Sequence, residues 1–370
     1  MDIFDLIKVI TNREVNINAC TVSDIGCRLI NKNSASNAAV GFCEILDNSI
    51  SNDEFPVAVK MFLSVDKSHD SYLDYKGLLY EVSVYKKINK VLHHTPNLIP
   101  FVGYGKCDVN MITEYFKETD VEKFLETQFP NTYTKSHTRK LHILITGRPE
   151  KSMSLKNMLN VSSPAKNTVI AKLKLWFQLI YTLKVLSDYN IQHNDLHESN
   201  VIVGRYPTHK KILYVINNTE FLIDTLNVVY IFDWDRAYTP SLGDNDLLYQ
   251  WSHINTINKI QPKFDLFTIS CLQTYNYFES KHGFEEDEDP GYEGVYKDLL
   301  RHILKGSDIS ALKSLFTDPK DPDKGFLCRP LVNIKNRAMD YVDILNLPVF
   351  KMFVYDKDRD GDYDYKYVMP

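Results

Sequence analysis

Ile191-Gln192-His193-Asn194-Asp195-Leu196-His197-Glu198-Ser199-Asn200-Val201 is the most informative segment of this chain. It has the pattern H-x-D-x-x-x-x-N and runs into an apolar strand. Further on, Val229-Tyr230-Ile231-Phe232-Asp233-Trp234-Asp235 is an apolar strand that ends in an aspartate. Phosphoryl transfer needs one carboxylate that orients an acceptor hydroxyl, and an Asn and a second Asp that hold magnesium. The two segments therefore predict that chemistry.

The composition is that of an ordinary globular chain. Its 370 residues are 44% hydrophobic and 25% charged, which is enough for two lobes. The formal net charge of -5 argues against a nucleic-acid partner, which would need a basic patch. The N-terminal residues have early acids and no long apolar core, so no signal peptide is expected. No apolar run is long enough for a membrane span, and no membrane partner is expected.

The cysteines are scattered along the chain without a C-x-x-C motif. There are six of them, at Cys20, Cys27, Cys43, Cys107, Cys271 and Cys328. This spacing predicts neither a disulfide framework nor a structural zinc site, and it favours a reducing compartment.

The first part of the chain predicts strands and one helix. Short β-branched runs indicate strands at residues 27–30, 40–46, 57–63, 98–103, 111–113 and 141–145. Helical spacing occurs over residues 78–88. Residues 114–138 are polar and are interpreted as an insertion, and the breaker cluster Thr146-Gly147-Arg148-Pro149 suits a hinge.

The second part of the chain predicts helices. Residues 168–189 are the longest candidate, and residues 154–159 and 264–275 are shorter ones. Residues 210–225 are interpreted as a strand-turn-strand insertion between the two motifs. Strands first and helices afterwards predict an α+β chain with an N-lobe at 1–146, a C-lobe at 147–370 and a cleft at the junction.

A cation for nucleotide phosphates is predicted at Lys60. It ends the segment Val57-Ala58-Val59-Lys60, which matches the V-A-I-K pattern on a third strand. An exposed lysine on a strand edge is the simpler interpretation. However, Glu81 lies on the next predicted helix, so strand, lysine, helix and glutamate follow in the order that a Lys–Glu ion pair requires.

Taken together, these motifs resemble the protein-kinase-like superfamily. The resemblance implies a bilobal fold with a β-rich N-lobe, a helical C-lobe and ATP bound in the cleft. It implies Asp195 as general base, Asn200 and Asp233 as magnesium ligands, and His193 as a brace for the loop. Asp265 matches the family's buried aspartate that anchors this loop, although a helix N-cap is an equally good interpretation.

The phosphate loop and several family positions depart from the pattern. Residues 33–41 contain a single glycine, Gly41, although small side chains can still let backbone amides approach phosphates. By resemblance, Val40, Gly41, Ala58 and Ile145 join Lys60 around the nucleotide. There is no A-P-E motif, and Asp233-Trp234-Asp235 carries no glycine.

His197 stands where the family usually has a lysine. One interpretation makes it catalytic, as a hydrogen-bond donor or a cation that acts on the γ-phosphate. The other packs it beneath the loop, with no charge role.

These departures resemble aminoglycoside and choline phosphotransferases. Over residues 25–280 they are more similar to divergent Ser/Thr protein kinases encoded by large DNA viruses. That resemblance implies phosphorylation of Ser/Thr hydroxyls of proteins, in host cytoplasm or packaged in a virion. The alternatives are a small-molecule phosphotransferase, and a non-catalytic pseudokinase or virion scaffold.

The acidic C-terminal segment has two interpretations. Residues 356–361 read D-x-D-x-D-G, the opening of a calcium loop, but position twelve is Tyr367 instead of Glu. A solvated acidic tail is the favoured interpretation.

Overall fold

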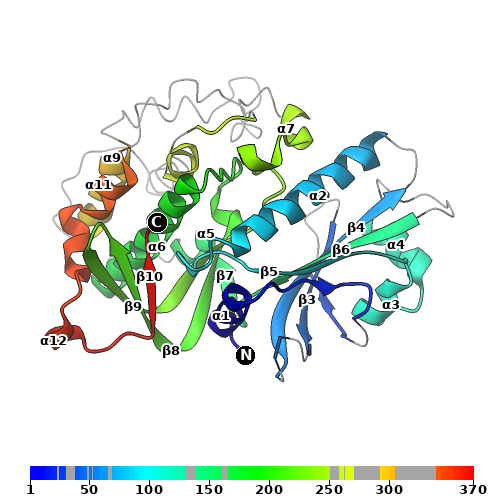
Figure 1. The fold of residues 1–370 in the computed structure, drawn as a ribbon, viewed down its shortest axis with the longest axis horizontal. Helices are drawn as coiled ribbons and strands as arrows, with labels where there is room; N and C mark the ends of the chain where they lie inside the picture. The colour runs from blue at the N-terminus through cyan, green and yellow to red at the C-terminus, as the bar shows by residue number, and fades with distance from the viewer. Residues whose placement is uncertain are drawn as a thin grey trace. The chain divides into compact units, whose positions relative to one another are not determined.

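The computed structural model describes residues 1–22, 25–30, 38–47, 50–51, 53–65, 69–130, 133, 139–159, 166–250, 258–261, 263–270, 292–304 and 339–370. Contacts divide the chain into two compact units (Figure 1). Unit 1 is Met1–Leu92 with Ile99–Glu150, and unit 2 is His93–Leu98 with Lys151–Pro370. The fold is α+β, as predicted, with a β-sheet N-terminal part and a helical part.

Unit 1 is built on a six-stranded sheet with the order β1-β5-β6-β4-β3-β2. The strands are β1 (Ile17–Asn18), β2 (Arg28–Leu29), β3 (Ala38–Ile45), β4 (Phe55–Val65), β5 (Phe101–Cys107) and β6 (Arg139–Gly147). Along β4, Val57, Val59 and Met61 are buried, whereas the residues between them are half-buried. This alternation places the apolar side chains of β4 on one face and Lys60 on the other.

The helices of unit 1 are α1 (Ile3–Asn12), α2 (His69–Asn89), α3 (Met111–Phe116) and α4 (Val121–Gln128). Helix α2 lies along one side of the sheet (Figure 1). The strand predicted at 111–113 is wrong, because these residues begin α3. A three-residue apolar run cannot distinguish the two states, and an Asp108-to-Met111 turn starts the helix here. The predicted insertion at 114–138 contains α4 among its described residues.

Two disulfides contradict the cysteine prediction. Cys20 is bonded to Cys107, and Cys27 is bonded to Cys43. The sheet brings these residues together: β1 pairs with β5, and the pairing of Arg28 with Phe42 places Cys27 opposite Cys43. The spacing of cysteines in the sequence could not show these bonds, because the two cysteines of each bond meet only when the strands pair. The argument for a reducing compartment thus loses its premise.

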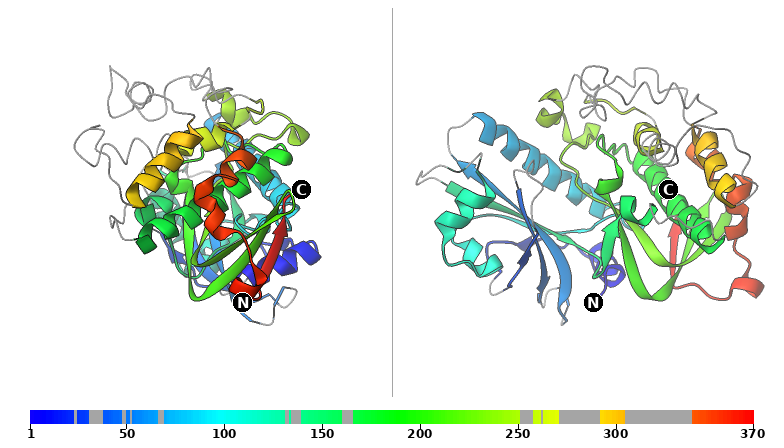
Figure 2. Two further views of the ribbon diagram at one scale, coloured as in Figure 1. Left: turned by 90° about the vertical axis from the view of Figure 1, so that its left-hand side faces the viewer. Right: turned by 180° about the vertical axis from the view of Figure 1, so that it is seen from behind.

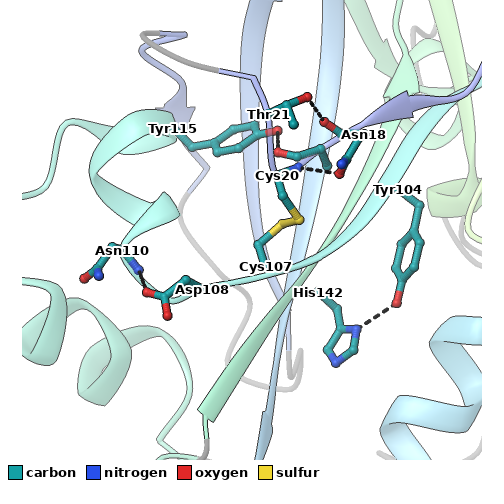
Figure 3. Close-up of a disulfide and its surroundings, with 10 residues drawn as sticks. Asn18, Cys20, Thr21, Tyr104, Cys107, Asp108, Asn110, Tyr115 and His142 are labelled. Atoms are coloured by element: carbon teal, nitrogen blue, oxygen red, sulfur yellow. Dashed lines mark hydrogen bonds between the residues drawn. A yellow bond between two sulfur atoms is a disulfide. The ribbon is translucent and has the colours of Figure 1, made fainter.

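The residues around the Cys20–Cys107 bond leave room for it and hold the neighbouring backbone by hydrogen bonds (Figure 3). A side-chain carbon added at Gly105 would lie 2.6 Å from the sulfur of Cys20, so only glycine leaves room for the bridge. The Tyr115 hydroxyl donates to the carbonyl of Ala19 at 2.9 Å, and the Cys20 amide donates to Asn18 at 3.0 Å. The segment next to β1 is therefore held by covalent and polar contacts together.

Unit 2 contains a long hairpin beside helix α6 (Lys166–Asp188). Its strands are β8 (Val201–Ile216) and β9 (Thr219–Ile231), joined at Asn217 and Asn218, which both have positive φ, as a type I′ turn requires. The segment at 210–225 is therefore the tip of one continuous hairpin, not a separate insertion. Helices α9 (Tyr292–Ile303) and α11 (Tyr341–Leu345) both contact α6. Figure 2 shows these helices on the same side of the hairpin as α6.

The other elements named in the described part of unit 2 are shorter than α6. They are β7 (Ser152–Ser154), α5 (Leu155–Leu159), η1 (Glu198–Asn200), η2 (Pro240–Leu242), α7 (Asp246–Gln250), α9 (Tyr292–Ile303), α11 (Tyr341–Leu345), η6 (Pro348–Phe353), α12 (Lys357–Asp360) and β10 (Tyr365–Val368). Residues 264–270 are helical, as predicted, and the rest of that predicted helix lies outside the described residues. Residues 33–37 of the predicted phosphate loop, Cys271 and Cys328 also lie outside them.

The acidic C-terminal segment is folded, and most of its acids are exposed to solvent. The Asp356 carboxylate caps α12 by accepting the Asp358 amide, and Asp364 accepts the Lys211 amide. Strand β10 then pairs in parallel with β8. The acids therefore serve as local hydrogen-bond acceptors. The described residues contain no group of three or more His, Cys, Asp or Glu side chains suited to a metal.

No helix in the described part of the chain is long and apolar enough to cross a membrane.

The disulfides generate a stability prediction. In the loop-closure description, the Cys20–Cys107 bond, which spans 87 residues, contributes about 4–5 kcal/mol to the free energy of unfolding. The Cys27–Cys43 bond, which spans 16 residues, contributes about 3 kcal/mol. We expect Cys20→Ser with Cys107→Ser to lower the denaturant midpoint more than Cys27→Ser with Cys43→Ser.

Peptide mapping without reductant should recover both cross-linked peptide pairs. Adding reductant should bring the wild type toward the stability of the variants. Wild-type protein that yields only free thiols at these positions, with unchanged stability in reductant, would contradict the assignment.

Candidate functional site

The loop after α6 is anchored by a buried carboxylate. Asp265 accepts the amide of His193 at 2.8 Å and the amide of Asn194 at 2.9 Å, one on each carboxylate oxygen. Burial raises the pKa of Asp265 to about 6, and the two amide hydrogen bonds oppose that rise. This is the anchoring role that the sequence resemblance predicts for Asp265.

The ring of His193 joins this loop to the end of β9. Its Nδ1 accepts the Asp195 amide at 3.3 Å, so Nε2 carries the proton and donates to the Phe232 carbonyl at 2.9 Å. Burial lowers the pKa of His193 to about 4, which keeps the ring neutral at pH 7. The ring also packs 4.6 Å from that of Trp234. His193 is therefore the predicted brace, with both nitrogens in use.

Asp195 has an ionic partner that the sequence analysis did not predict. Arg236 Nη1 lies 2.9 Å from the carboxylate, which is 13% exposed. Burial raises the pKa of Asp195 to about 7, despite the opposing charge of Arg236. A carboxylate with this pKa holds a proton more strongly than an ordinary aspartate does. The signal for Arg236 was its position directly after Asp233-Trp234-Asp235, but no local pattern links it to residue 195.

Asn200 and Asp233 lie on segments tied to the same loop. The Asn200 side-chain NH₂ donates to the Asp195 carbonyl at 3.0 Å, and the Phe232 amide donates to the Asn200 carbonyl at 3.2 Å. Asp233 has φ 67, in the left-handed region that Asp tolerates better than most residues. Burial lowers the pKa of His193 and of His197, and the negative charge of Asp233 opposes that lowering. At Asp195 the same charge adds to the rise in pKa that burial causes.

The donor set fits a magnesium ion. Because the NH₂ of Asn200 is engaged, its side-chain oxygen is directed away from the Asp195 carbonyl, and it has no partner among the described residues. An amide oxygen and a carboxylate are hard oxygen donors, which magnesium prefers, with water and phosphate oxygens as its other ligands. Asn200 and Asp233 would hold the ion.

His197 caps the short helix η1 and is not placed as a cation. Its Nδ1 accepts the Ser199 amide at 3.2 Å, and burial lowers the pKa of the ring. Its Nε2 lies 3.9 Å from the Asp195 carboxylate, beyond hydrogen-bond distance. These contacts favour the neutral interpretation of His197, since protonated Nδ1 could not accept the Ser199 amide.

A buried polar network fixes strand β9, which leads to Asp233. Asn97 donates to Gln178 at 3.0 Å and to the Val229 carbonyl at 2.9 Å, and its oxygen accepts the Tyr214 hydroxyl at 2.8 Å. Gln178 on α6 also accepts the Val229 amide. Sequence reasoning missed both residues. The available signal was a glutamine among apolar residues along the helix at 168–189.

The predicted lysine–glutamate pair forms within unit 1. Lys60 Nζ lies 3.2 Å and 3.1 Å from the two carboxylate oxygens of Glu81. Glu81 on α2 is 1% exposed and Lys60 on β4 is 22% exposed. The ammonium is thus held between a buried carboxylate and partly accessible space, which is the arrangement a phosphate-binding cation requires.

The strand register separates the other predicted nucleotide contacts into two faces. Val40 pairs with Lys60, and Ala58 lies two residues before it, so both share the face of Lys60. Gly41 and Ile145 both pair with Val59 and lie on the opposite face. Residues Leu144 and Thr146 of β6, which the sequence analysis missed, lie on the face of Lys60 instead.

Gly41 has a packing reason for being glycine. A side-chain carbon there would lie 2.5 Å from the ring of Phe116 and 3.2 Å from Cys27. The absence of a side chain at Gly41 therefore lets α3 approach β3.

Sequence comparisons with known proteins agree with these motifs. Residues 37–213 match the family model for protein tyrosine and serine/threonine kinases. Over 199 residues the chain is 26% identical to the serine/threonine-protein kinase VPS15 of Saccharomyces cerevisiae, a match that covers 50% of this chain and 13% of VPS15. The crystal structure of the Rad53 kinase domain and SCD2 aligns with 13% identity and a TM-score of 0.39, over 89% of this chain and 90% of that one. The sequence matches support a place in the protein-kinase-like superfamily.

The anchor at Asp265 generates a prediction about the loop backbone. In Asp265→Asn, one carboxylate oxygen becomes an NH₂ group that faces an amide N–H, so one hydrogen bond to a charged acceptor is lost. Such bonds contribute about 1.5–3 kcal/mol, and we expect the His193 and Asn194 amides to exchange with solvent about tenfold to a hundredfold faster.

Hydrogen exchange measured by NMR checks this expectation. Asp188→Asn is the matched control, because Asp188 pairs with Lys184 at the end of α6 and contacts neither amide. Unchanged protection of both amides in Asp265→Asn would show that the carboxylate does not hold the loop.

Proposed function

We propose that this chain transfers the γ-phosphoryl group of ATP, with magnesium, to Ser/Thr hydroxyls of proteins. The observation that supports it most is the arrangement of the loop at 193–200, where Asp195 is presented by a backbone that Asp265 and His193 fix. The match of residues 37–213 to protein kinases supports the same reaction class.

Asp195 is proposed to orient the acceptor hydroxyl and to accept its proton. Its raised pKa, about 7, makes it a stronger base than an exposed aspartate, and at neutral pH a large share of it remains ionised. Arg236 would hold the carboxylate in one orientation, as the 2.9 Å ion pair does.

Lys60 is proposed to bind the nucleotide phosphates, with Glu81 keeping the ammonium in place. Asn200 and Asp233 would hold magnesium by their side-chain oxygens. When bound, the metal ion neutralises charge on the phosphates. Val40 and Ala58, on the face of Lys60, would contact the nucleotide.

The acceptor class is the least constrained part of the proposal. A small-molecule phosphotransferase is the second candidate, which the absence of A-P-E favours, and a non-catalytic scaffold is the third. A viral type, and a place in host cytoplasm or in a virion, rest on the sequence resemblance alone. The two disulfides favour an oxidising location for unit 1.

Transfer of radioactive phosphate from ATP to generic Ser/Thr substrates tests the function. We expect Asp195→Asn to lower turnover by at least about a hundredfold, because the acceptor hydroxyl loses its base. Nucleotide affinity should change little in this variant, since Asp195 is not proposed to bind phosphate or metal.

Asp343→Asn, an exposed change of the same charge on α11, is the matched control and should transfer normally. Equal turnover in Asp195→Asn and the wild type would refute the base role. Label that appears on small hydroxylated compounds, but on no protein, would support the small-molecule alternative instead.

A further inference from the structure

A cavity of about 590 Å³ lies within unit 2, away from the loop at 193–200. Its walls come from α6, β8, β9, η6 and α12, so it is formed by the hairpin, the long helix and the folded C-terminal segment. The volume falls in the range of small-molecule sites, which are about 300–1,000 Å³. One part of the wall is apolar, with Ile170, Leu222 and Phe353.

Two lysines give the cavity a cationic side. Lys174 Nζ donates to the backbone carbonyl of Asp224, and Lys211 Nζ donates to the backbone carbonyl of Asp360 at 3.0 Å. Each ammonium has three N–H donors, and these carbonyls are its hydrogen-bond partners within the described part of the chain. Neither lysine lies within 4.0 Å of a carboxylate oxygen of a described residue. Both therefore keep donors for a ligand.

The two carboxylates in the wall are already engaged by other groups. Asp224 lies 2.5 Å from Nδ1 of His209. Asp360 accepts from Arg359 Nε at 2.8 Å and Nη2 at 2.7 Å, and the same guanidinium lowers the pKa of Asp360 to about 2. Asp224 also interacts electrostatically with Lys174, and Asp360 with Lys211, but neither lysine forms a close ion pair with a described residue.

Lys174 has a further reason to gain from an anion. Lys174 is half-buried, and burial lowers the pKa of its ammonium, while the charge of Asp224 opposes that lowering. An anion beside it would replace the lost hydration with a charge-assisted hydrogen bond.

We propose that this cavity binds a small organic anion. Its phosphate or carboxylate group would accept hydrogen bonds from Lys174 and Lys211, and its apolar part would lie against Ile170, Leu222 and Phe353. The proposal is independent of the proposed phosphoryl transfer, since none of these residues belongs to that site.

Calorimetric titration of the full chain with four probes tests the proposal. Phenyl phosphate and benzoate carry both an anion and an aromatic ring, phenol carries the ring alone, and inorganic phosphate carries the anion alone. We expect phenyl phosphate or benzoate to bind more tightly than phenol and inorganic phosphate, and the tighter of the two identifies the anion class. Lys174→Gln and Lys211→Gln should each lower that affinity at least about tenfold, because each removes a hydrogen bond between charged groups.

Lys184→Gln is the matched control, since Lys184 lies on the same helix but pairs with Asp188 outside the cavity. It should bind the probes as the wild type does. If Lys174→Gln fails to fold, which a thermal melt would show, Lys211→Gln decides alone. Affinity unchanged in the folded lysine variants, equal binding of phenol and phenyl phosphate, or no binding of any probe at millimolar concentration would each overturn the proposal.

Discussion

The two amide hydrogen bonds to the buried carboxylate of Asp265 are the constraint on which the candidate site depends. They fix the backbone at His193 and Asn194, and the His193 ring then transmits that position to two further points. Its Nδ1 holds the amide of Asp195, and its Nε2 holds the carbonyl of Phe232, the residue before Asp233. A base candidate and a metal-ligand candidate are thus oriented by one neutral histidine. Burial keeps it neutral, so this brace does not require a charge at pH 7.

The scaffold behind this loop is polar as well as apolar. Asn97 and Gln178 bind the backbone of β9 at Val229, four residues before Asp233. Buried amides of this kind are costly when unpaired, but here each makes several hydrogen bonds, so they specify one position of the strand. In unit 1 the positions of the corresponding side chains are fixed by strand register, which places Lys60, Val40 and Ala58 on one face of the sheet.

The sequence predicted what local order determines, and it missed what tertiary pairing determines. Periodicity and spacing predicted the strand with Lys60, the helix with Glu81 and the order of the two later motifs. The expected ion pair between Lys60 and Glu81 is present. The disulfides could not be predicted, because Cys20 and Cys107 are 87 residues apart and meet only when β1 pairs with β5. The pairing of Arg236 with Asp195 likewise depends on the approach of two loops. The face of the sheet on which Ile145 lies depends on the register between β6 and β4, which the sequence of one strand cannot show.

The central proposal is that Lys60 contacts the phosphates of a magnesium nucleotide and that Asp233 acts through the metal ion. Calorimetric affinity for a non-hydrolysable ATP analogue with magnesium tests it most directly, in the wild type, Lys60→Met and Asp233→Asn. Each residue is proposed to supply an ionic contact to the phosphates or to the metal, so each variant should lose at least about tenfold in affinity. The loss in Asp233→Asn should disappear when magnesium is omitted, because that residue acts through the metal. Wild-type affinity in both variants, or no binding by the wild type, would contradict the account.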